Sequence, residues 1–328
     1  MQSTLYLHCG LPKTGTTFLR GEVVSHLPVD TLIKPKSDLF NNKRNWVGVL
    51  EEAFNKSPVI WDDLGEKIFG DLLDGTLEKG REDVLISEEH VCQSQEPVQF
   101  RGHLSRFRRL TRQWGFDNLR LLVSIRRQAD VFASRYAQGS GRHLGASQSD
   151  FEQRVRSYIS MTQTYQQYNY HGHGVTRNYE HLWKAMVEAV GAENILMLPY
   201  EMMKEDLSSF MEAWLSFINI DMDAAMLVDK AKEGEKIRKR NVRSSSENRW
   251  ALRPRSREGA QILNMRPTRL FQALGLPTKV PLRWPDFNRD DEIHLTPELR
   301  AEVMNFYESS NRATAEAIGI DLGQYGYY

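Results

Sequence analysis

The chain has 328 residues, with 43 basic and 43 acidic side chains, and 40% of its residues are hydrophobic. A formal charge of zero gives no net field to attract nucleic acid, and the composition is that of a globular protein. Two cysteines, Cys9 and Cys92, are too few for a disulfide framework or for a zinc site of their own. No apolar run is long enough to cross a bilayer and no leader-like segment stands at the start, so we expect a cytoplasmic protein without a transmembrane segment.

Five short, apolar, β-prone runs predict strands. They lie at Thr4–Cys9, Val29–Ile33, Val84–Ser87, Leu119–Ile125 and Asn194–Leu198. Amphipathic sequences predict helices at Asp150–Gln167, His181–Val190, Leu207–Phe217 and Leu295–Tyr307. Because strands alternate with helices, we expect an α/β fold with a P-loop-like, mostly parallel sheet flanked by helices, and with helical insertions. We see no dividing linker and interpret residues 1–328 as a single domain.

The composition of the chain changes after residue 228. Residues 230–257 contain eleven Lys or Arg but three Asp or Glu, with three consecutive serines at 244–246. Such a basic, serine-containing stretch is more typical of a mobile surface segment than of a core element. We therefore expect residues 230–257 to form a basic, mobile segment of the domain.

A glycine-containing loop, GLPKTGTT at residues 10–17, follows the first predicted strand and opens a helix. In this position the backbone N–H groups and the positive end of the helix dipole point at an anion. Nucleotide hydrolases require a lysine where Thr16 stands, whereas here Lys13 lies inside the loop. They also require an acidic magnesium ligand after a later strand, but the fourth predicted strand ends in Arg126 and Arg127. The loop therefore indicates a phosphate site of another kind.

Two motifs resemble those of one family. The loop resembles the 5′-phosphosulfate loop of sulfotransferases that use 3′-phosphoadenosine 5′-phosphosulfate (PAPS). The sequence RRQADVFAS at residues 126–134 resembles their 3′-phosphate motif, in which an arginine at a strand end is followed by Asp and Ser, four and eight residues later. Arg126, Asp130 and Ser134 occupy these positions. The segment at 194–201 is similar to the family's strand followed by Tyr-Glu. The C-terminal sequence, with the helix Leu295–Tyr307, Asn311 and residues 322–327, looks like that of bacterial members that modify carbohydrates.

The resemblance implies a PAPS-dependent sulfotransferase and suggests which residues hold PAPS. The implied residues are Pro12, Lys13, Thr14, Gly15, Thr16, Thr17, Arg126 and Ser134. An arginine presents several N–H donors to a phosphate dianion, and a serine on the helix that follows adds a hydroxyl. We further expect the segment 230–257 to fold over the cofactor and to bring Arg238, Arg240 or Ser244 near its phosphates, with Arg240 as the first candidate.

Sulfuryl transfer is an in-line displacement that needs a base for the acceptor hydroxyl and a cation beside the leaving phosphate oxygen. Lys13 suits the second role, because fixed positive charge stabilises the negative charge that develops there. Glu88, Glu89 and His90 follow the third predicted strand, at the sheet edge that faces the loop. In the family the base is a His or a Glu at this strand end, and the Ser-x-Glu pattern resembles members that use Glu. We therefore favour Glu89, then His90, then Glu88.

The resemblance implies a carbohydrate or glycoconjugate acceptor, such as a glycan or a glycolipid. Arg127 and Gln128 replace the Asn-Pro of the steroid and phenol enzymes, which argues against a small aromatic acceptor. The segment Tyr168–His173 carries rings that suit stacking on sugars, although chance aromatics in a polar loop explain it equally well. Five arginines between residues 101 and 112 form a basic helix face that is either solvated or a site for an anionic glycan.

Two other functions fit parts of the sequence. A P-loop small-molecule kinase would need a lysine at position 16, and a non-enzymatic nucleotide-binding or nucleic-acid-binding module would use the segment 230–257. The neutral charge and the absence of a nucleic-acid motif argue against the second. We expect no metal, because His171, His173 and His181 lack a completing ligand at a familiar spacing.

Overall fold

The computed structural model describes residues 3–11, 13–33, 46–73, 83–92, 97–140, 147–160, 177–234, 273–274 and 293–328. The chain divides into two compact units. Unit 1 comprises Met1–Arg127, Gln163–Lys236 and Tyr307–Tyr328, and unit 2 comprises Gln128–Thr162 and Ile237–Phe306. The interpretation of residues 1–328 as one domain stays a prediction.

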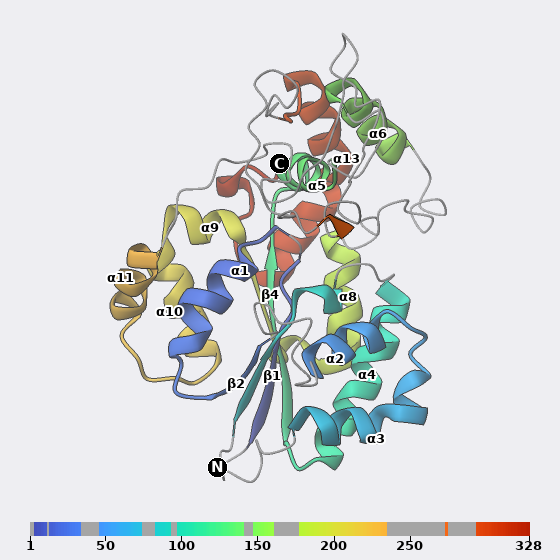
Figure 1. Cartoon of the computed structure of the whole chain (residues 1–328). Coiled ribbons are helices and arrows are strands. Elements are labelled where there is room, and N and C mark those ends of the chain that lie inside the picture. The colour runs from blue at the N-terminus through green and yellow to red at the C-terminus, as the bar shows by residue number, and fades with distance from the viewer. Residues whose placement is uncertain are drawn as a thin grey trace. The chain divides into compact units, whose positions relative to one another are not determined.

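Unit 1 contains a parallel sheet of five strands in the order β2-β3-β1-β4-β5 (Figure 1). The strands are β1 Thr4–His8, β2 Asp30–Ile33, β3 Val84–Ser87, β4 Asn118–Ile125 and β5 Ile195–Pro199. Each of the four pairings between neighbouring strands is parallel. The predicted α/β fold and all five predicted strands are therefore confirmed, with shifts of one residue at several ends. The central position of β1 places the glycine-containing loop in the middle of the carboxyl edge of the sheet.

Helices cover both faces of this sheet (Figure 1). The longer helices of unit 1 are α2 Trp46–Phe54, α3 Ile60–Leu73, α4 Pro97–Gln113, α8 Tyr179–Val190, α9 Tyr200–Glu205, α10 Leu207–Phe217 and α11 Ala224–Gly234. Short helical turns are α1 Thr16–Phe18, η1 Leu19–Val23, η2 Val24–His26, η4 Glu89–Cys92, η6 Ala192–Asn194 and η7 Gly323–Tyr325. The predicted helix at Leu207–Phe217 is confirmed with the same bounds, and the one at His181–Val190 begins two residues earlier.

The alternation of side chains along β1 divides the core of unit 1 in two. Leu5 and Leu7 pack into a cluster beneath α3, α4 and α8, whereas Tyr6 between them packs into a second cluster beneath η1, α10 and α11. Successive residues of a strand point to opposite faces, so both faces of this strand are apolar. A strand buried on both faces is held rigidly, and the loop that follows it therefore starts from a fixed point.

Unit 2 contains α5 Gln128–Ser140, α6 Gln148–Ser160 and the start of α13 Pro297–Ile318, whose later residues belong to unit 1. The predicted helix at Asp150–Gln167 is found in α6, and residues 161–167 lie outside the described part. The predicted C-terminal helix is found in α13, which continues eleven residues beyond the predicted end at Tyr307. Among the described helices, none combines the length and the apolar character that a bilayer crossing requires.

Candidate functional site

The loop after β1 continues along β4 before it turns into α1. The N–H of Leu11 donates to the carbonyl of Ser124 at 3.0 Å, which carries the chain beyond the end of the strand. The buried hydroxyl of Thr14 donates back to the carbonyl of Leu11 and closes the turn. A ligand contact of Thr14 would therefore rest on its backbone rather than on its hydroxyl. Thr17, by contrast, is exposed at the start of the helix.

Both glycines of the loop are needed for steric reasons. Gly15 has φ of +80°, a left-handed conformation that side chains rarely adopt, and a Cβ there would lie 2.3 Å from Cε of Met203. A Cβ on Gly10 would lie 2.6 Å from Cγ2 of Thr16. At Gly10 the neighbour is a β-branched side chain with little freedom to move. At Gly15 the nearest atom is the flexible end of Met203, so the positive φ is the firmer restriction there.

Lys13 is the strained residue of the loop. Its φ is 71°, which is uncommon for a residue with a side chain and recurs at functional sites. Its carbonyl accepts a hydrogen bond of 2.8 Å from Nη1 of Arg126, the first residue after β4. Two predicted phosphate-binding residues, 113 positions apart in the sequence, are thus in direct contact.

Arg126 is fixed from three sides within unit 1. Tyr179 donates its hydroxyl to the backbone carbonyl of Arg126, and the ring of Tyr200 lies 4.8 Å from the guanidinium carbon. Within the described part of the chain, the buried Nε of Arg126 has no hydrogen-bond partner. A buried donor without a partner is costly unless a ligand satisfies it, which suits a phosphate-binding arginine.

The turn after β3 places its two carboxylates differently. Glu88 is 0% exposed, and its N–H donates to the carbonyl of His8 at 3.0 Å. Glu89 begins η4 with a side chain that is 22% exposed and accepts a hydrogen bond from the hydroxyl of Thr16. The side chain of His90 lies outside the described part of the structure. Of the two carboxylates, Glu89 is therefore the one that lies at the loop and is accessible to solvent.

Arg20, one helical turn after Thr16, lies beside both carboxylates. Its Nη1 is 4.0 Å from Glu88 and its Nη2 is 3.8 Å from Glu89. Sequence reasoning missed Arg20. The signal that could have found it is its spacing from Thr16. Residues four apart on a helix share a face, so the side chains at positions 16 and 20 contact the same neighbours.

His8, the last residue of β1, lies beneath this cluster. Its Nδ1 is 2.8 Å from the hydroxyl of Ser87, and its ring packs edge-on against Trp214. Burial, together with the nearby charge of Arg20, lowers the pKa of His8 to about 3. The imidazole is therefore neutral at physiological pH and contributes packing and hydrogen bonding rather than charge.

A second buried carboxylate lies at the end of β4. Glu201, at the start of α9, accepts a hydrogen bond of 2.8 Å from the hydroxyl of Tyr327 and lies 3.5 Å from Nε of Arg127. Burial raises the pKa of Glu201, partly offset by these contacts. The Tyr-Glu segment and the C-terminal sequence, noted separately in the sequence, thus meet next to Arg126.

The other predicted residues fall into two groups, those in unit 2 and those outside the described part of the chain. Ser134 lies half-buried on α5 in unit 2, where Asp130 accepts a 2.7 Å hydrogen bond from Arg300. Pro12, Arg240 and the Tyr168–His173 segment lie outside the described residues, as does most of 230–257. In the described part of the chain, no group of three or more His, Cys, Asp and Glu side chains is arranged to hold a metal ion.

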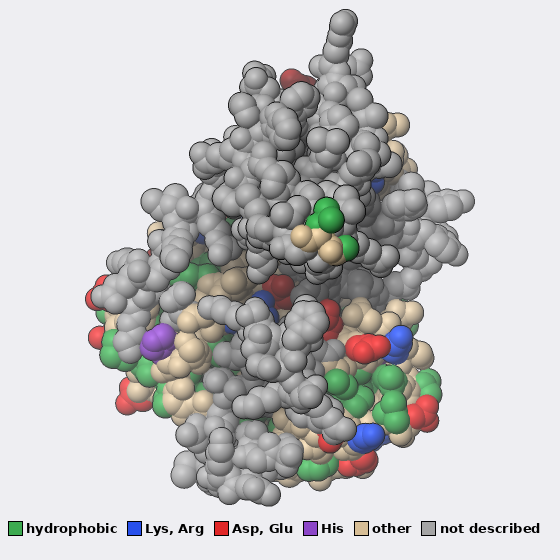
Figure 2. All heavy atoms as spheres, in the orientation of Figure 1, with side chains coloured by type: hydrophobic (Ala, Val, Ile, Leu, Met, Phe, Trp, Pro, Cys, Tyr) green, Lys and Arg blue, Asp and Glu red, His purple; other side chains and the backbone are tan. Residues whose placement is uncertain are grey.

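Three of the five arginines on the basic face of α4 pair with acidic side chains of neighbouring helices. Arg106 and Arg109 both donate to Asp62 of α3, at 2.9 and 2.6 Å, and Arg101 pairs with Glu188 of α8. Figure 2 shows acidic and basic side chains next to one another in this region. These contacts favour a structural role for the arginines over a track for an anionic glycan.

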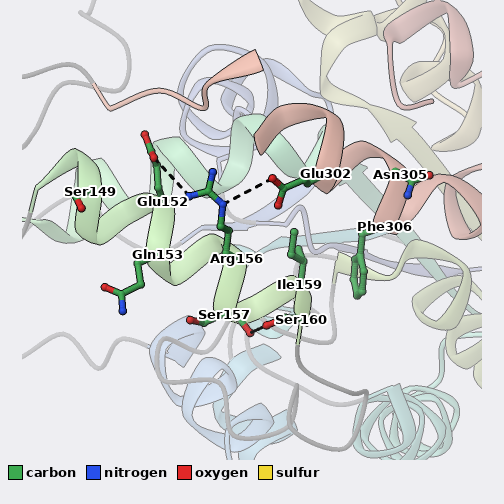
Figure 3. Close-up of a pocket in the computed structure, with 10 residues that line it drawn as sticks. All are labelled: Ser149, Glu152, Gln153, Arg156, Ser157, Ile159, Ser160, Glu302, Asn305 and Phe306. Atoms are coloured by element: carbon green, nitrogen blue, oxygen red, sulfur yellow. Dashed lines mark hydrogen bonds and ion pairs between the residues drawn. The ribbon is translucent and has the colours of Figure 1, made fainter. Parts of the chain in front are cut away.

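Unit 2 contains a hollow of about 820 Å³ between α6 and the start of α13 (Figure 3). Arg156 lies at its centre, 3.7 Å from Glu152 and 3.7 Å from Glu302. Serine, glutamine and asparagine side chains line the rest, together with Ile159 and Phe306, which is 37% exposed. Most lining side chains are thus polar, with one arginine against two glutamates and one aromatic ring.

Known proteins were found to resemble this chain at two levels, in one family model and in solved structures. No curated protein sequence matches the chain. Among solved structures, a sulfotransferase from Alicyclobacillus acidocaldarius is 12% identical with a TM-score of 0.42, covering 98% of this chain and 97% of that one. The mouse sulfotransferase SULT7A1 complexed with PAP is 12% identical with a TM-score of 0.45, covering 99% and 90%. The family model of the sulfotransferase domain matches residues 5–256, so this chain belongs to the sulfotransferase family and is a PAPS-dependent enzyme.

Proposed function

We propose that the enzyme transfers the sulfuryl group of PAPS to a hydroxyl of a carbohydrate or glycoconjugate, with Glu89 as the general base. The observation that carries this proposal is the hydrogen bond from Thr16 to Glu89. It joins the loop that the motif assigns to the phosphosulfate to a solvent-accessible carboxylate. A base must lie within reach of the acceptor proton, and the acceptor must approach the sulfur at this loop.

The proposed reaction is a single in-line displacement. The acceptor oxygen forms a bond to sulfur while the bond from sulfur to the 5′-phosphate oxygen breaks. Glu89 takes the acceptor proton, and adenosine 3′,5′-bisphosphate (PAP) leaves with the electron pair. The ammonium of Lys13 stabilises the charge that develops on the leaving oxygen.

The choice among the three candidate bases follows from burial. Glu88 is 0% exposed, so an acceptor hydroxyl has no path to its carboxylate without a rearrangement of the turn. Glu89 is accessible and held at the loop. His90 remains the second candidate for the base, and this ranking rests on the family pattern alone. These contacts support Glu89 as the base.

We further propose that Arg126 and Ser134 bind the 3′-phosphate of PAPS, as their motif implies. The buried Nε of Arg126, without a hydrogen-bond partner in the described part, supports the role of the arginine. Pro12, Thr14 to Thr17 and Arg240 keep their proposed contacts from the sequence. Limited proteolysis tests Arg240 and its segment, since cutting within 230–257 should slow when PAP is added. Cutting that PAP leaves unchanged would contradict the covering role.

A carbohydrate acceptor also suits the hollow of unit 2. Planar polar side chains such as Arg156 and Asn305 bond to sugar hydroxyls, and an aromatic ring such as Phe306 offers an apolar surface to a sugar face. If the hollow binds the acceptor, Asn305→Ala should raise KM for the acceptor several-fold and leave PAP affinity unchanged. An unchanged KM would remove this hollow from the acceptor site.

A screen with labelled PAPS tests the proposed acceptor class. The acceptors are lactose, N-acetyllactosamine, heparosan and chondroitin oligosaccharides and a glucosylceramide, with 4-nitrophenol and a sterol as non-carbohydrate hydroxyls. We expect label on at least one carbohydrate. Transfer to 4-nitrophenol or the sterol alone would overturn the carbohydrate proposal and leave the reaction class intact. A cytoplasmic location stays a prediction, which cell fractionation tests.

A further inference from the structure

We propose that Arg20 is a positioning residue for the reaction, holding the carboxylate of Glu89 at the phosphate loop while the buried Glu88 holds Arg20. The inference rests on the proposed role of Glu89 as the base. It assigns a function to an arginine that neither phosphate motif contains.

The first step concerns Arg20 and Glu88. The carboxylate of Glu88 is fully buried, and the side chain of Arg20 is itself 15% exposed. Burying a carboxylate is strongly unfavourable unless a cation lies nearby, so the pair at 4.0 Å constrains where the guanidinium lies. Arg20 is therefore fixed from the core side.

The second step concerns the geometry of the guanidinium. Nη1 faces Glu88 and Nη2 faces Glu89, at 4.0 and 3.8 Å. A planar group with two terminal nitrogens can face two carboxylates at once, whereas the ammonium of a lysine is a single point charge. The guanidinium, held in place by the buried carboxylate of Glu88, can therefore hold the accessible carboxylate of Glu89.

The third step concerns the other contact of Glu89. Thr16 donates to Oε2 of Glu89, and Arg20 lies nearest to Oε1, so the two carboxylate oxygens have different neighbours. Thr16 and Arg20 are four residues apart, in α1 and the π-helical turn η1 that continues it. Both contacts thus come from the helix that the phosphate loop opens. A base held by this helix keeps its orientation toward whatever the loop binds.

A simpler reading is that Arg20 only neutralises the buried Glu88, and paired variants separate the two roles. Arg20→Ala alone should lower both the melting temperature and turnover, because it removes a cation from beside a buried carboxylate. In Arg20→Ala/Glu88→Gln both charges are gone, so the melting temperature should recover toward wild type. Turnover, measured with the best acceptor of the panel above, should stay at least tenfold low. Recovery of turnover together with stability would overturn the inference.

A second set of variants tests whether Arg20 acts through Glu89. Arg20→Lys keeps the charge and is expected to fold, but it should lower kcat several-fold with little change in KM for PAPS. In the Glu89→Gln background the same change should have almost no further effect, since there is no base left to position. A full, additive loss in that background would show that Arg20 acts elsewhere.

Two controls make the outcomes distinguishable. PAP affinity should stay within threefold of wild type in every Arg20 variant, and a tenfold loss would identify Arg20 as a phosphate ligand instead. The matched control Arg101→Ala/Glu188→Gln removes an exposed ion pair between α4 and α8 and should change neither kcat nor PAP affinity. If Glu89→Gln keeps normal turnover, the proposed base is wrong. If Glu89→Gln is inactive while Arg20→Ala/Glu88→Gln is active, only the inference about Arg20 fails and the proposed base stands.

Discussion

The hydroxyl of Thr16 donates a hydrogen bond to the carboxylate of Glu89, although the two residues are 73 positions apart in the sequence. Thr16 lies in the loop after β1 and Glu89 in the turn after β3, and these strands are neighbours in the sheet. The contact links the residues proposed to bind the donor to the residue proposed to activate the acceptor. The contribution of this hydrogen bond to turnover can be measured by substituting either Thr16 or Glu89.

Thr16→Val tests the contact from the side of the loop. Valine keeps the shape of threonine but removes the donor, so Glu89 loses a hydrogen bond of about 1.5–3 kcal/mol, as expected for a charged acceptor. We expect turnover to fall at least tenfold, measured as PAP release from PAPS with a saturating acceptor. Thr16→Ser keeps the hydroxyl and should retain most of the activity. Near-normal turnover in Thr16→Val together with a loss in Thr16→Ser would mean that the methyl group, not the hydroxyl, matters.

Glu89→Gln tests the proposed role of Glu89 as the general base. Glutamine keeps the size and the hydrogen-bonding reach but cannot take a proton, so turnover should fall by about 10²–10⁴. PAP affinity, measured by calorimetry, should remain near wild type. Parallel measurements on Glu88→Gln and His90→Asn rank the candidates. Near-normal turnover in Glu89→Gln, combined with an inactive His90→Asn, would transfer the role to the imidazole.

Arg126→Ala tests the 3′-phosphate site. The wild-type protein should bind PAP much more tightly than AMP, because AMP lacks the phosphate that the second motif is proposed to hold. The variant should lose about 1.5–3 kcal/mol of PAP binding, the scale of a charged hydrogen bond, with little change for AMP. The exposed Arg101→Ala serves as a control for the loss of a positive charge. Equal affinity of the wild type for PAP and AMP would contradict the site.

Gly15→Ala tests the packing of the loop against α9, and Gly115→Ala provides a matched control. Both glycines have positive φ, +80° and +89°, but a Cβ meets Met203 at 2.3 Å in the first and nothing within 4 Å in the second. We expect both variants to lose stability from backbone strain. The loss at Gly15 should be larger by about 1–3 kcal/mol because of overpacking, measured by chemical denaturation. Equal losses would mean that Met203 moves aside freely.

His8 predicts a pH dependence of stability. Its pKa is about 3 in the folded state and near 6.5 when unfolded, so the unfolded state binds the proton more readily. The contribution is therefore present above pH 6.5 and lost as the pH falls toward 3. Between pH 7 and pH 5 the free energy of unfolding should drop by about 2 kcal/mol on this account. His8→Asn should remove that part of the slope, and parallel curves for the variant and the wild type would contradict it.

The sequence alone determined the strands, the loop and the family. A strand that is buried on both faces has consecutive apolar residues, as in Leu5–Leu7, and this signal does not depend on distant residues. The loop could be read for the same reason, since a glycine-containing turn between a strand and a helix has one local geometry. The phosphate motif after β4 was also local, with Arg126 at the strand end and its partners on the helix that follows.

The tertiary structure decided how neighbouring candidates differ. Glu88 and Glu89 are chemically identical and adjacent, but one is buried beside His8 and the other reaches Thr16. The order of the strands sets this difference, because it determines which helix lies beside the turn. Sequence spacing carries no information on that order.

Arg20 and the arginines of α4 depended on tertiary structure in the same way. In the sequence all of them are basic side chains on amphipathic helices. In the fold Arg20 lies between two carboxylates at the proposed site, whereas Arg106 and Arg109 share Asp62 on a neighbouring helix. A charge acquires its role from partners that are distant in the sequence, because Coulomb attraction depends on separation in space and on burial. Local periodicity therefore predicted the elements, and long-range packing selected the chemistry.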